Sequence, residues 1–344
     1  MKFRMARALS LVVLACLVWS APVVLAADPA NSAEPAPAGL AVDGDGNVYV
    51  SDYAFDRMVK FGPDGSVLGQ WGGTGNAFGQ FSAPFGVAVD ANNTVYVVDQ
   101  LNNRVQRFST DGSSLGAWGG AGADAGDLRT PFGVAVGGGR VYVADFGNDR
   151  VQVFGADGSL LWMLGGHGNG DGQFQRPAGV AVGPDGALYV TDHFNDRVQR
   201  FSSEGHFQAQ FGAALTASIG GTATPAATGV PTPTLGTATP PASSGSSSEA
   251  QLRRPEGIVT DRDGNLWVAD YGHDRVVKLS PEGHLLLSSG NRGSAPGEFL
   301  GPKGVAIDPS SGRVYVADTG NARVQRLAPD GTPEATWSMP ALPS

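Results

Sequence analysis

Cysteine is nearly absent from this chain of 344 residues, in which Cys16 is the only one. A single thiol forms no intramolecular disulfide, so packing and backbone hydrogen bonds must stabilise the fold. Long helical patterns are also missing beyond the N-terminal segment, whereas glycine is abundant, at 51 residues. That much glycine is typical of a chain with many tight turns between short strands.

Charged residues are scarce as well, at 16% of the sequence, and the formal net charge is −9. An acidic surface repels phosphate backbones. We therefore expect no nucleic-acid partner.

Residues 1–27 have the pattern of a signal peptide. Three basic residues near the start precede a largely apolar run from Ala8 to Leu25, and small residues follow. We expect the segment to be removed and the protein to be secreted or held at the cell surface. Retention as a membrane anchor and lipidation at Cys16 are the alternatives, and membrane contact is expected only in those two cases.

One short phrase, Pro-x-Gly followed by an apolar run, recurs six times. Its glycines are Gly39, Gly86, Gly133, Gly179, Gly257 and Gly304, which are 47, 47, 46, 78 and 47 residues apart. Such a regular period indicates a repeat architecture, with one insertion after the fourth copy.

Each copy contains four strand-like runs, which we name a to d. In the second copy they are "GVAVD", "TVYVVD", "RVQRF" and "SLGAWG". Runs such as "VYV" are continuously apolar, which is typical of strands covered on both faces. Sheets stacked radially satisfy this condition, so the sequence predicts an all-β fold, a six-bladed β-propeller of four-stranded antiparallel blades.

The expected organisation follows from this period. A short linker at 28–36 precedes the propeller at 37–337, and a tail at 338–344 follows it. Residues 213–248, which are rich in Thr, Pro and Ser and carry no charge, are expected to be a disordered insertion between blades four and five. The expected blades span about 37–81, 84–128, 131–174, 177–212, 255–299 and 302–337.

The repeated phrase "P-x-G-V-A-V-D-x-x-G-x-V-Y-V-x-D-x-x-N-x-R-V-Q-x-F-x-x-D-G" resembles the NHL repeat. The resemblance covers nearly the whole chain after the N-terminal segment and implies a six-bladed propeller. Propellers of this kind carry unrelated activities, so the resemblance does not specify a function.

Peptide-amidating lyases are similar propellers, and their family holds zinc through three histidines, some of them at the Pro-x-Gly position. No histidine occupies that position here. His167, His193 and His273 share one end of the predicted propeller but occupy different loop positions, while His206 and His284 fall at the other end. We therefore expect no metal site, no cofactor and no catalytic residue.

Every copy places an Asp at the end of strand b and an Arg five residues later. Because strands b and c form a hairpin, each pair should meet as an ion pair that stabilises its blade. The pairs are Asp52/Arg57, Asp99/Arg104, Asp145/Arg150, Asp192/Arg197, Asp270/Arg275 and Asp318/Arg323.

The d–a and b–c connections lie at one end of the sheets, which we call the loop face. Variable side chains on a repeated frame are where repeat proteins place their binding sites. The candidate ligand-binding residues at the middle of Pro-x-Gly are Phe85, Phe132, Glu256 and Lys303. Those directly after the strand-b Asp are Tyr53, Gln100, Phe146, His193 and Tyr271.

Two functions remain open at this point. The first is an exported, non-catalytic binding or scaffold propeller that recognises a peptide, glycan or protein through its loop face. The alternative is a metal-dependent lyase or hydrolase centred on the channel.

Overall fold

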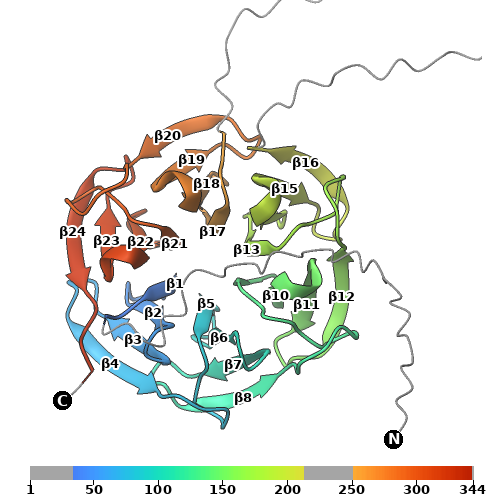
Figure 1. Ribbon diagram of the computed structural model, residues 1–344, viewed down its shortest axis with the longest axis horizontal. Helices are drawn as coiled ribbons and strands as arrows, with labels where there is room; N and C mark the ends of the chain where they lie inside the picture. The colour runs from blue at the N-terminus through green and yellow to red at the C-terminus, as the bar shows by residue number, and fades with distance from the viewer. Residues whose placement is uncertain (1–33, 213–250, 343–344) are drawn as a thin grey trace, which may run out of the picture. The chain divides into compact units, whose positions relative to one another are not determined.

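Six four-stranded antiparallel sheets surround one axis in the computed structural model, which describes residues 34–212 and 251–342 (Figure 1). Each sheet consists of four consecutive strands, numbered here as blades one to six, with its first strand next to the axis and its fourth at the rim. The predicted six-bladed, all-β propeller is confirmed. In the described part of the chain, no helix has the length and apolarity needed to cross a membrane.

The strands are short and end at closely similar register positions in each blade. The innermost strands are β1 (Pro37–Val42), β5 (Pro84–Val89), β9 (Val134–Gly137), β13 (Pro177–Val182), β17 (Pro255–Thr260) and β21 (Pro302–Ile307). The second strands are β2 (Val48–Asp52), β6 (Val95–Asp99), β10 (Arg140–Asp145), β14 (Leu188–Asp192), β18 (Leu266–Asp270) and β22 (Val314–Asp318). The third strands are β3 (Arg57–Phe61), β7 (Arg104–Phe108), β11 (Arg150–Gly155), β15 (Arg197–Phe201), β19 (Arg275–Leu279) and β23 (Arg323–Leu327). The outermost strands are β4 (Val67–Gly72), β8 (Ser114–Trp118), β12 (Leu160–Gly165), β16 (Phe207–Phe211), β20 (Leu285–Ser289) and β24 (Pro333–Ser338).

The core lies between blades rather than inside any one of them. The second strand is buried on both faces, as its continuous apolar sequence predicts. Each of six separate hydrophobic clusters contains residues of two neighbouring blades, and the cluster between blades six and one closes the ring. A single blade would leave both apolar faces in water, so several copies of the repeat must pack face to face to bury them.

Parts of the expected organisation fall outside the described residues, namely the signal peptide at 1–27, residues 28–33 of the linker and the insertion at 213–248. The end of the linker is described and already contacts blade one. The Ala36 amide donates to Asp52 Oδ1 at 2.9 Å, and the Tyr53 amide donates to the Ala36 carbonyl at 3.1 Å.

The six Asp–Arg pairs form, with Nε–Oδ2 distances between 2.6 and 3.0 Å. The same arginines also reach beyond their own blades. Arg104 donates from Nη1 to the Asn76 carbonyl at 2.7 Å and from Nη2 to the Ala77 carbonyl at 2.8 Å, both in the preceding d–a connection. These pairs therefore fix the connections of the loop face as well as the b–c hairpins.

An asparagine and a glutamine complete this attachment in four blades. In blade two, Asn102 Nδ2 donates to the Gly75 carbonyl and Gln106 Nε2 donates to the Gln80 carbonyl. Equivalent bonds come from Asn148 and Gln152, Asn195 and Gln199, and Asn321 and Gln325. The loop face is thus a rigid surface over most of its circumference.

The C-terminal residues take part in closing the ring. Met339 is 6% exposed and packs in the cluster between blades six and one, and Arg57 donates to the carbonyls of Pro340 and Ala341. Each blade keeps its own four strands, so within residues 34–212 and 251–342 no strand is exchanged between the first and last blades. The predicted tail is therefore attached to blade one as far as Ala341.

Candidate functional site

The glycine of each Pro-x-Gly phrase lets neighbouring blades meet at the axis. A Cβ atom on Gly86 would lie 2.5 Å from the Phe132 carbonyl oxygen, and the same overlap occurs at the other five glycines. Gly304 meets the Ala38 carbonyl in this way, which continues the arrangement across the ring closure. The repeated glycine is therefore required by the close approach of backbones around the channel.

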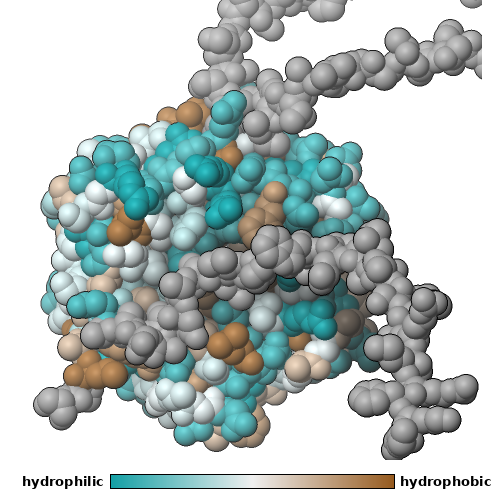
Figure 2. Space-filling view, viewed as in Figure 1, coloured by the Kyte–Doolittle hydropathy of each residue, from teal (hydrophilic) through white to brown (hydrophobic). Residues whose placement is uncertain are grey.

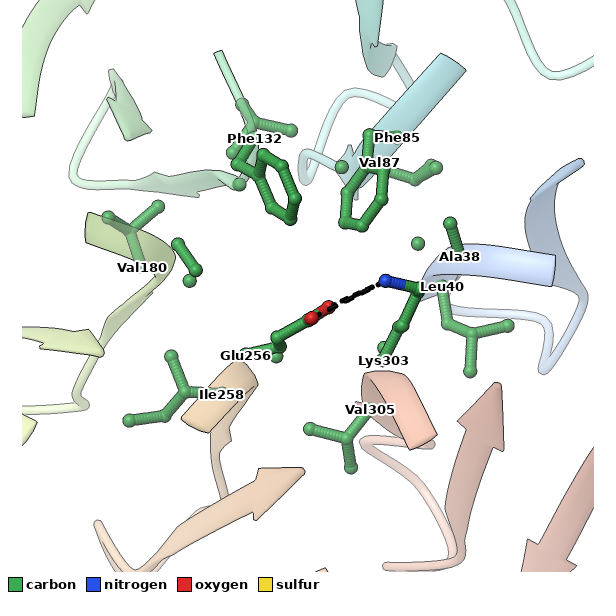
Figure 3. A pocket seen from close by; sticks show the side chains of 18 residues that line it. Ala38, Leu40, Phe85, Val87, Phe132, Val180, Glu256, Ile258, Lys303 and Val305 are labelled. Atoms are coloured by element: carbon green, nitrogen blue, oxygen red, sulfur yellow. Dashed lines mark hydrogen bonds and ion pairs between the residues drawn. The ribbon is translucent and has the colours of Figure 1, made fainter. Parts of the chain in front are cut away.

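The middle residue of each phrase lies at the channel (Figure 3). Ala38, Phe85, Phe132, Ala178, Glu256 and Lys303 line it together with the ring of Leu40, Val87, Val134, Val180, Ile258 and Val305. The cavity in the channel has a volume of about 60 Å³ and is partly open to solvent. Phe85, Phe132, Glu256 and Lys303 are all buried, so they narrow the channel and leave room for a few water molecules rather than for a large ligand.

An ion pair occupies the channel. Lys303 Nζ lies 3.4 Å from a carboxylate oxygen of Glu256, and both side chains point into the channel (Figure 3). Burial lowers the pKa of Lys303, but the Glu256 carboxylate and the hydroxyls of Tyr53 and Tyr271 more than offset it, so the pKa is raised overall. Lys303 is therefore a stable cation at neutral pH.

Aromatic side chains form a series of ring contacts beside this ion pair, and Lys303 closes the series into a ring. Phe85 contacts Tyr53 and Phe132, with ring centres 6.1 and 4.0 Å apart, and Phe132 stacks on Phe146 at 4.6 Å. From Phe146 the contacts continue to His193 at 6.2 Å.

Tyr271 and Lys303 close the series of contacts. The ring centres of His193 and Tyr271 are 6.5 Å apart, and Lys303 Nζ lies 4.9 Å from the centre of Tyr271 and 5.9 Å from that of Tyr53. Cation–π contacts of this kind stabilise a desolvated ammonium. The series of contacts gives the channel mouth a fixed, largely aromatic floor.

The candidate residues thus divide by exposure. Phe146 and His193 are buried like the channel residues, whereas Tyr53, Gln100 and Tyr271 are half-buried and accessible from the loop face. Burial lowers the pKa of His193, although Glu256 and the Pro255 carbonyl act in the opposite direction. The accessible part of the candidate site is therefore its outer ring.

Sequence reasoning missed the basic residues at the inner ends of the d–a connections. Arg129, Arg176, Arg253 and Arg254 occupy the one or two positions before the proline in blades three, four and five. The sequence contains the pattern that could have revealed them: arginine occupies these positions in three consecutive blades, and no acidic residue occupies them in blades two to six.

The three histidines of the loop face contact different partners. His167 Nδ1 lies 2.9 Å from Asp149, His273 Nδ1 lies 3.0 Å from Asp270, and His193 Nδ1 lies 3.3 Å from the Pro255 carbonyl. Across residues 34–212 and 251–342, no three or more His, Cys, Asp or Glu side chains are grouped so that they could share a metal ion.

Several solved structures share the fold at low identity. The chain is similar to virginiamycin B lyase from Staphylococcus aureus, with a TM-score of 0.56 and 14% identity over 90% of this chain and 86% of that one. A gluconolactonase from Xanthomonas campestris gives a TM-score of 0.55 and 16% identity over 83% and 84% of the two chains. A protein of unknown function from Bacteroides caccae gives 0.57 and 11% over 85% and 93%. Identities this low establish the fold alone.

No curated protein matches this sequence significantly. The model of the NHL repeat matches residues 128–154, 174–201, 252–279 and 299–327, which cover strands of blades three to six and the connections before them. The remaining two blades have the same topology and the same Asp–Arg register. The chain therefore carries NHL repeats in a six-bladed β-propeller.

Proposed function

We propose that the protein is an exported binding propeller that recognises a peptide, glycan or protein through its loop face, at the cell surface or outside the cell. The observation that carries this proposal is the ring of varied side chains on a repeated frame. Tyr53, Gln100 and Tyr271 occupy one register position, are half-buried, and are held by blades whose other polar residues repeat. Rigid surfaces with varied, partly exposed aromatic residues are typical of recognition sites.

A channel-centred lyase or hydrolase is the second candidate, supported by the shared fold of virginiamycin B lyase and of the gluconolactonase. The small cavity and its ion pair do not favour a substrate inside the channel. For a lyase or hydrolase, the geometry permits a reaction at the channel mouth rather than inside the channel. Stoichiometric zinc or calcium in the purified protein, together with turnover, would favour it over binding alone.

The binding proposal is tested with arrays of peptides and glycans. The variant Tyr53→Ser/Tyr271→Ser removes two half-buried aromatic residues from the loop face. As a matched control, Val67→Ser/Leu68→Ser removes two exposed apolar residues from β4 at the rim. We expect the first variant to lose the wild-type ligands and the second to keep them, with melting temperatures recorded for both. Loss of the ligands in the control alone would place recognition at the rim instead.

A further inference from the structure

We propose that the loop face above blades three, four and five binds the carboxylate groups of an acidic polysaccharide. This inference rests on the proposed binding function and names its ligand class. Basic residues are the reason: Arg129, Arg176, Arg253 and Arg254 stand at the inner ends of three consecutive d–a connections. In a chain of net charge −9, such a one-sided group of cations is unexpected for a surface without a partner.

None of these four guanidinium groups has a carboxylate partner within 4.0 Å among the described residues. Two acidic side chains of the loop face accept the backbone amides of these arginines instead. Asp149 Oδ1 accepts the Arg176 amide at 2.7 Å, and its Oδ2 contacts His167, while Asp196 Oδ1 accepts the Arg254 amide at 2.7 Å. The positive charge is thus left for a ligand.

Two of the arginines are held against aromatic rings. The guanidinium carbon of Arg176 lies 5.4 Å from the centre of Phe146, and that of Arg254 lies 5.9 Å from the centre of Phe194. Arg176 Nη1 also donates to the Phe146 carbonyl at 3.4 Å. A guanidinium that rests on a ring loses less conformational freedom when it pairs with a carboxylate in its plane.

Half-buried aromatic side chains lie beside these cations. Phe194 and Tyr271 offer apolar surface to the C–H faces of sugar rings, and Figure 2 shows hydrophilic side chains gathered above blade five on the face turned to the viewer. The edges of the sheets lie in the narrow channel, along the innermost strands, and at the rim, along the outermost strands, so an extended peptide finds no strand to pair with at this site. Carboxylated sugars fit the combination best.

The test uses the mature full-length protein and immobilised polygalacturonate, with its methyl ester as the uncharged version of the same polymer. We expect binding to the acid, much weaker binding to the ester, and a further loss at high salt. The variant Arg176→Gln/Arg254→Gln should bind about tenfold more weakly. The control Arg140→Gln/Arg262→Gln removes the same charge from the opposite end of the sheets and should bind as the wild type does.

Equal binding of acid and ester, no binding of the acid, or unchanged binding by the double variant would overturn the proposal. Tighter binding of polyglutamate or of single-stranded RNA would also overturn it, in favour of an acidic protein or a nucleic acid. Because Arg254 is exposed, the single variants Arg254→Gln and Arg254→Lys guard against a folding defect, and the lysine variant should retain part of the affinity. If polygalacturonate does not bind but ligands from the arrays still require Tyr53 and Tyr271, the ligand class is wrong and the binding function is retained.

Discussion

At the scale of single residues, the glycines of the six Pro-x-Gly phrases decide how closely the blades approach the axis. The Gly86 amide donates to the Phe132 carbonyl at 2.9 Å, and a Cβ atom at Gly86 would lie 2.5 Å from the same oxygen. Neither backbone can withdraw, because Gly86 belongs to β5 and the Phe132 amide donates to the Ala144 carbonyl of β10, each within its own blade.

We predict that Gly86→Ala lowers the free energy of unfolding by about 2–3 kcal/mol, since overpacking against backbone has no side chain to relax. Gly69→Ala is the control, because a Cβ atom there meets nothing within 4 Å. Urea titration of both variants measures the difference. Equal stability of the two would show that the blades can move apart at the axis.

The environment of His193 opposes its charged form. Burial lowers its pKa below the ordinary 6.5, and the cations Lys303 and Arg254 act in the same direction, while Glu256 opposes them. Below pH 6.5 the unfolded chain therefore gains a proton that the folded protein does not.

We expect the free energy of unfolding to fall as the pH drops from 6.5 through the lowered pKa of His193. In His193→Gln this part of the pH dependence should disappear, whereas His284→Gln, a change at an exposed histidine of the opposite end, should retain it. Denaturant titrations at several pH values test this. An identical pH profile for the wild type and His193→Gln would contradict it.

At the scale of elements, an asparagine and a glutamine flank the arginine of four blades and attach a d–a connection to each of them. Blade one has Phe55 and Val59 at these positions, and blade five has His273 and Val277. These are the two blades that do not follow an ordinary connection: one comes after the N-terminal segment and the other after the insertion. The polar pair is present only where a short loop needs it.

We predict that Gln106→Val detaches the connection before blade two. Loss of the side chain leaves the Gly79 amide without its partner and the Gln80 carbonyl with Arg104 Nη2 as its remaining donor, which costs about 1–3 kcal/mol. Hydrogen exchange should increase in residues 75–80 and stay unchanged in the corresponding connection before blade four. Unaltered exchange in residues 75–80 would mean that Arg104 alone holds this connection.

The sequence was sufficient for the strands, the blade count and the register of the Asp–Arg pairs, because all three follow from a repeat compared with itself. It was also sufficient, in principle, for the loop attachment, since Phe55 and His273 stand out from the four asparagines. It did not reveal that Phe85, Phe132, Glu256 and Lys303 narrow the channel. The width of the channel depends on how closely the backbones approach one another. The repeated glycine permits a close approach, but the pattern alone does not give its distance.

At the scale of the whole molecule, the ring is closed by side chains and by the C-terminal residues. Each of the five d–a connections, the one with the insertion included, places one apolar residue between blades: Phe81, Leu128, Phe174, Leu252 and Phe299. The corresponding position before blade one is Glu34, and the interface between blades six and one buries Met339. The chain end thus supplies apolar contact where no connection does.

We predict that truncation after Ser338 lowers the free energy of unfolding by about 2–4 kcal/mol, because it removes a buried methionine. The same truncation removes the Pro340 and Ala341 carbonyls that accept from Arg57. Truncation after Ala341 keeps these contacts and should have little effect. Thermal and denaturant unfolding of the two truncated proteins decides, and equal melting temperatures would show that the tail is dispensable for closure.

Blade five lacks the asparagine and the glutamine that attach other d–a connections, and this indicates where the chain can be cut without loss of the ring. Among the described residues, the junction between β16 and β17 lacks the two amide side chains that hold four of the other connections, since His273 and Val277 replace them. A circular permutant that begins at Gln251 and finishes at Gly212, with the former termini fused by a flexible peptide, should therefore assemble the same six blades. The chain would then not need to be continuous at that junction. Complementary packing between neighbouring blades would be sufficient to close the ring.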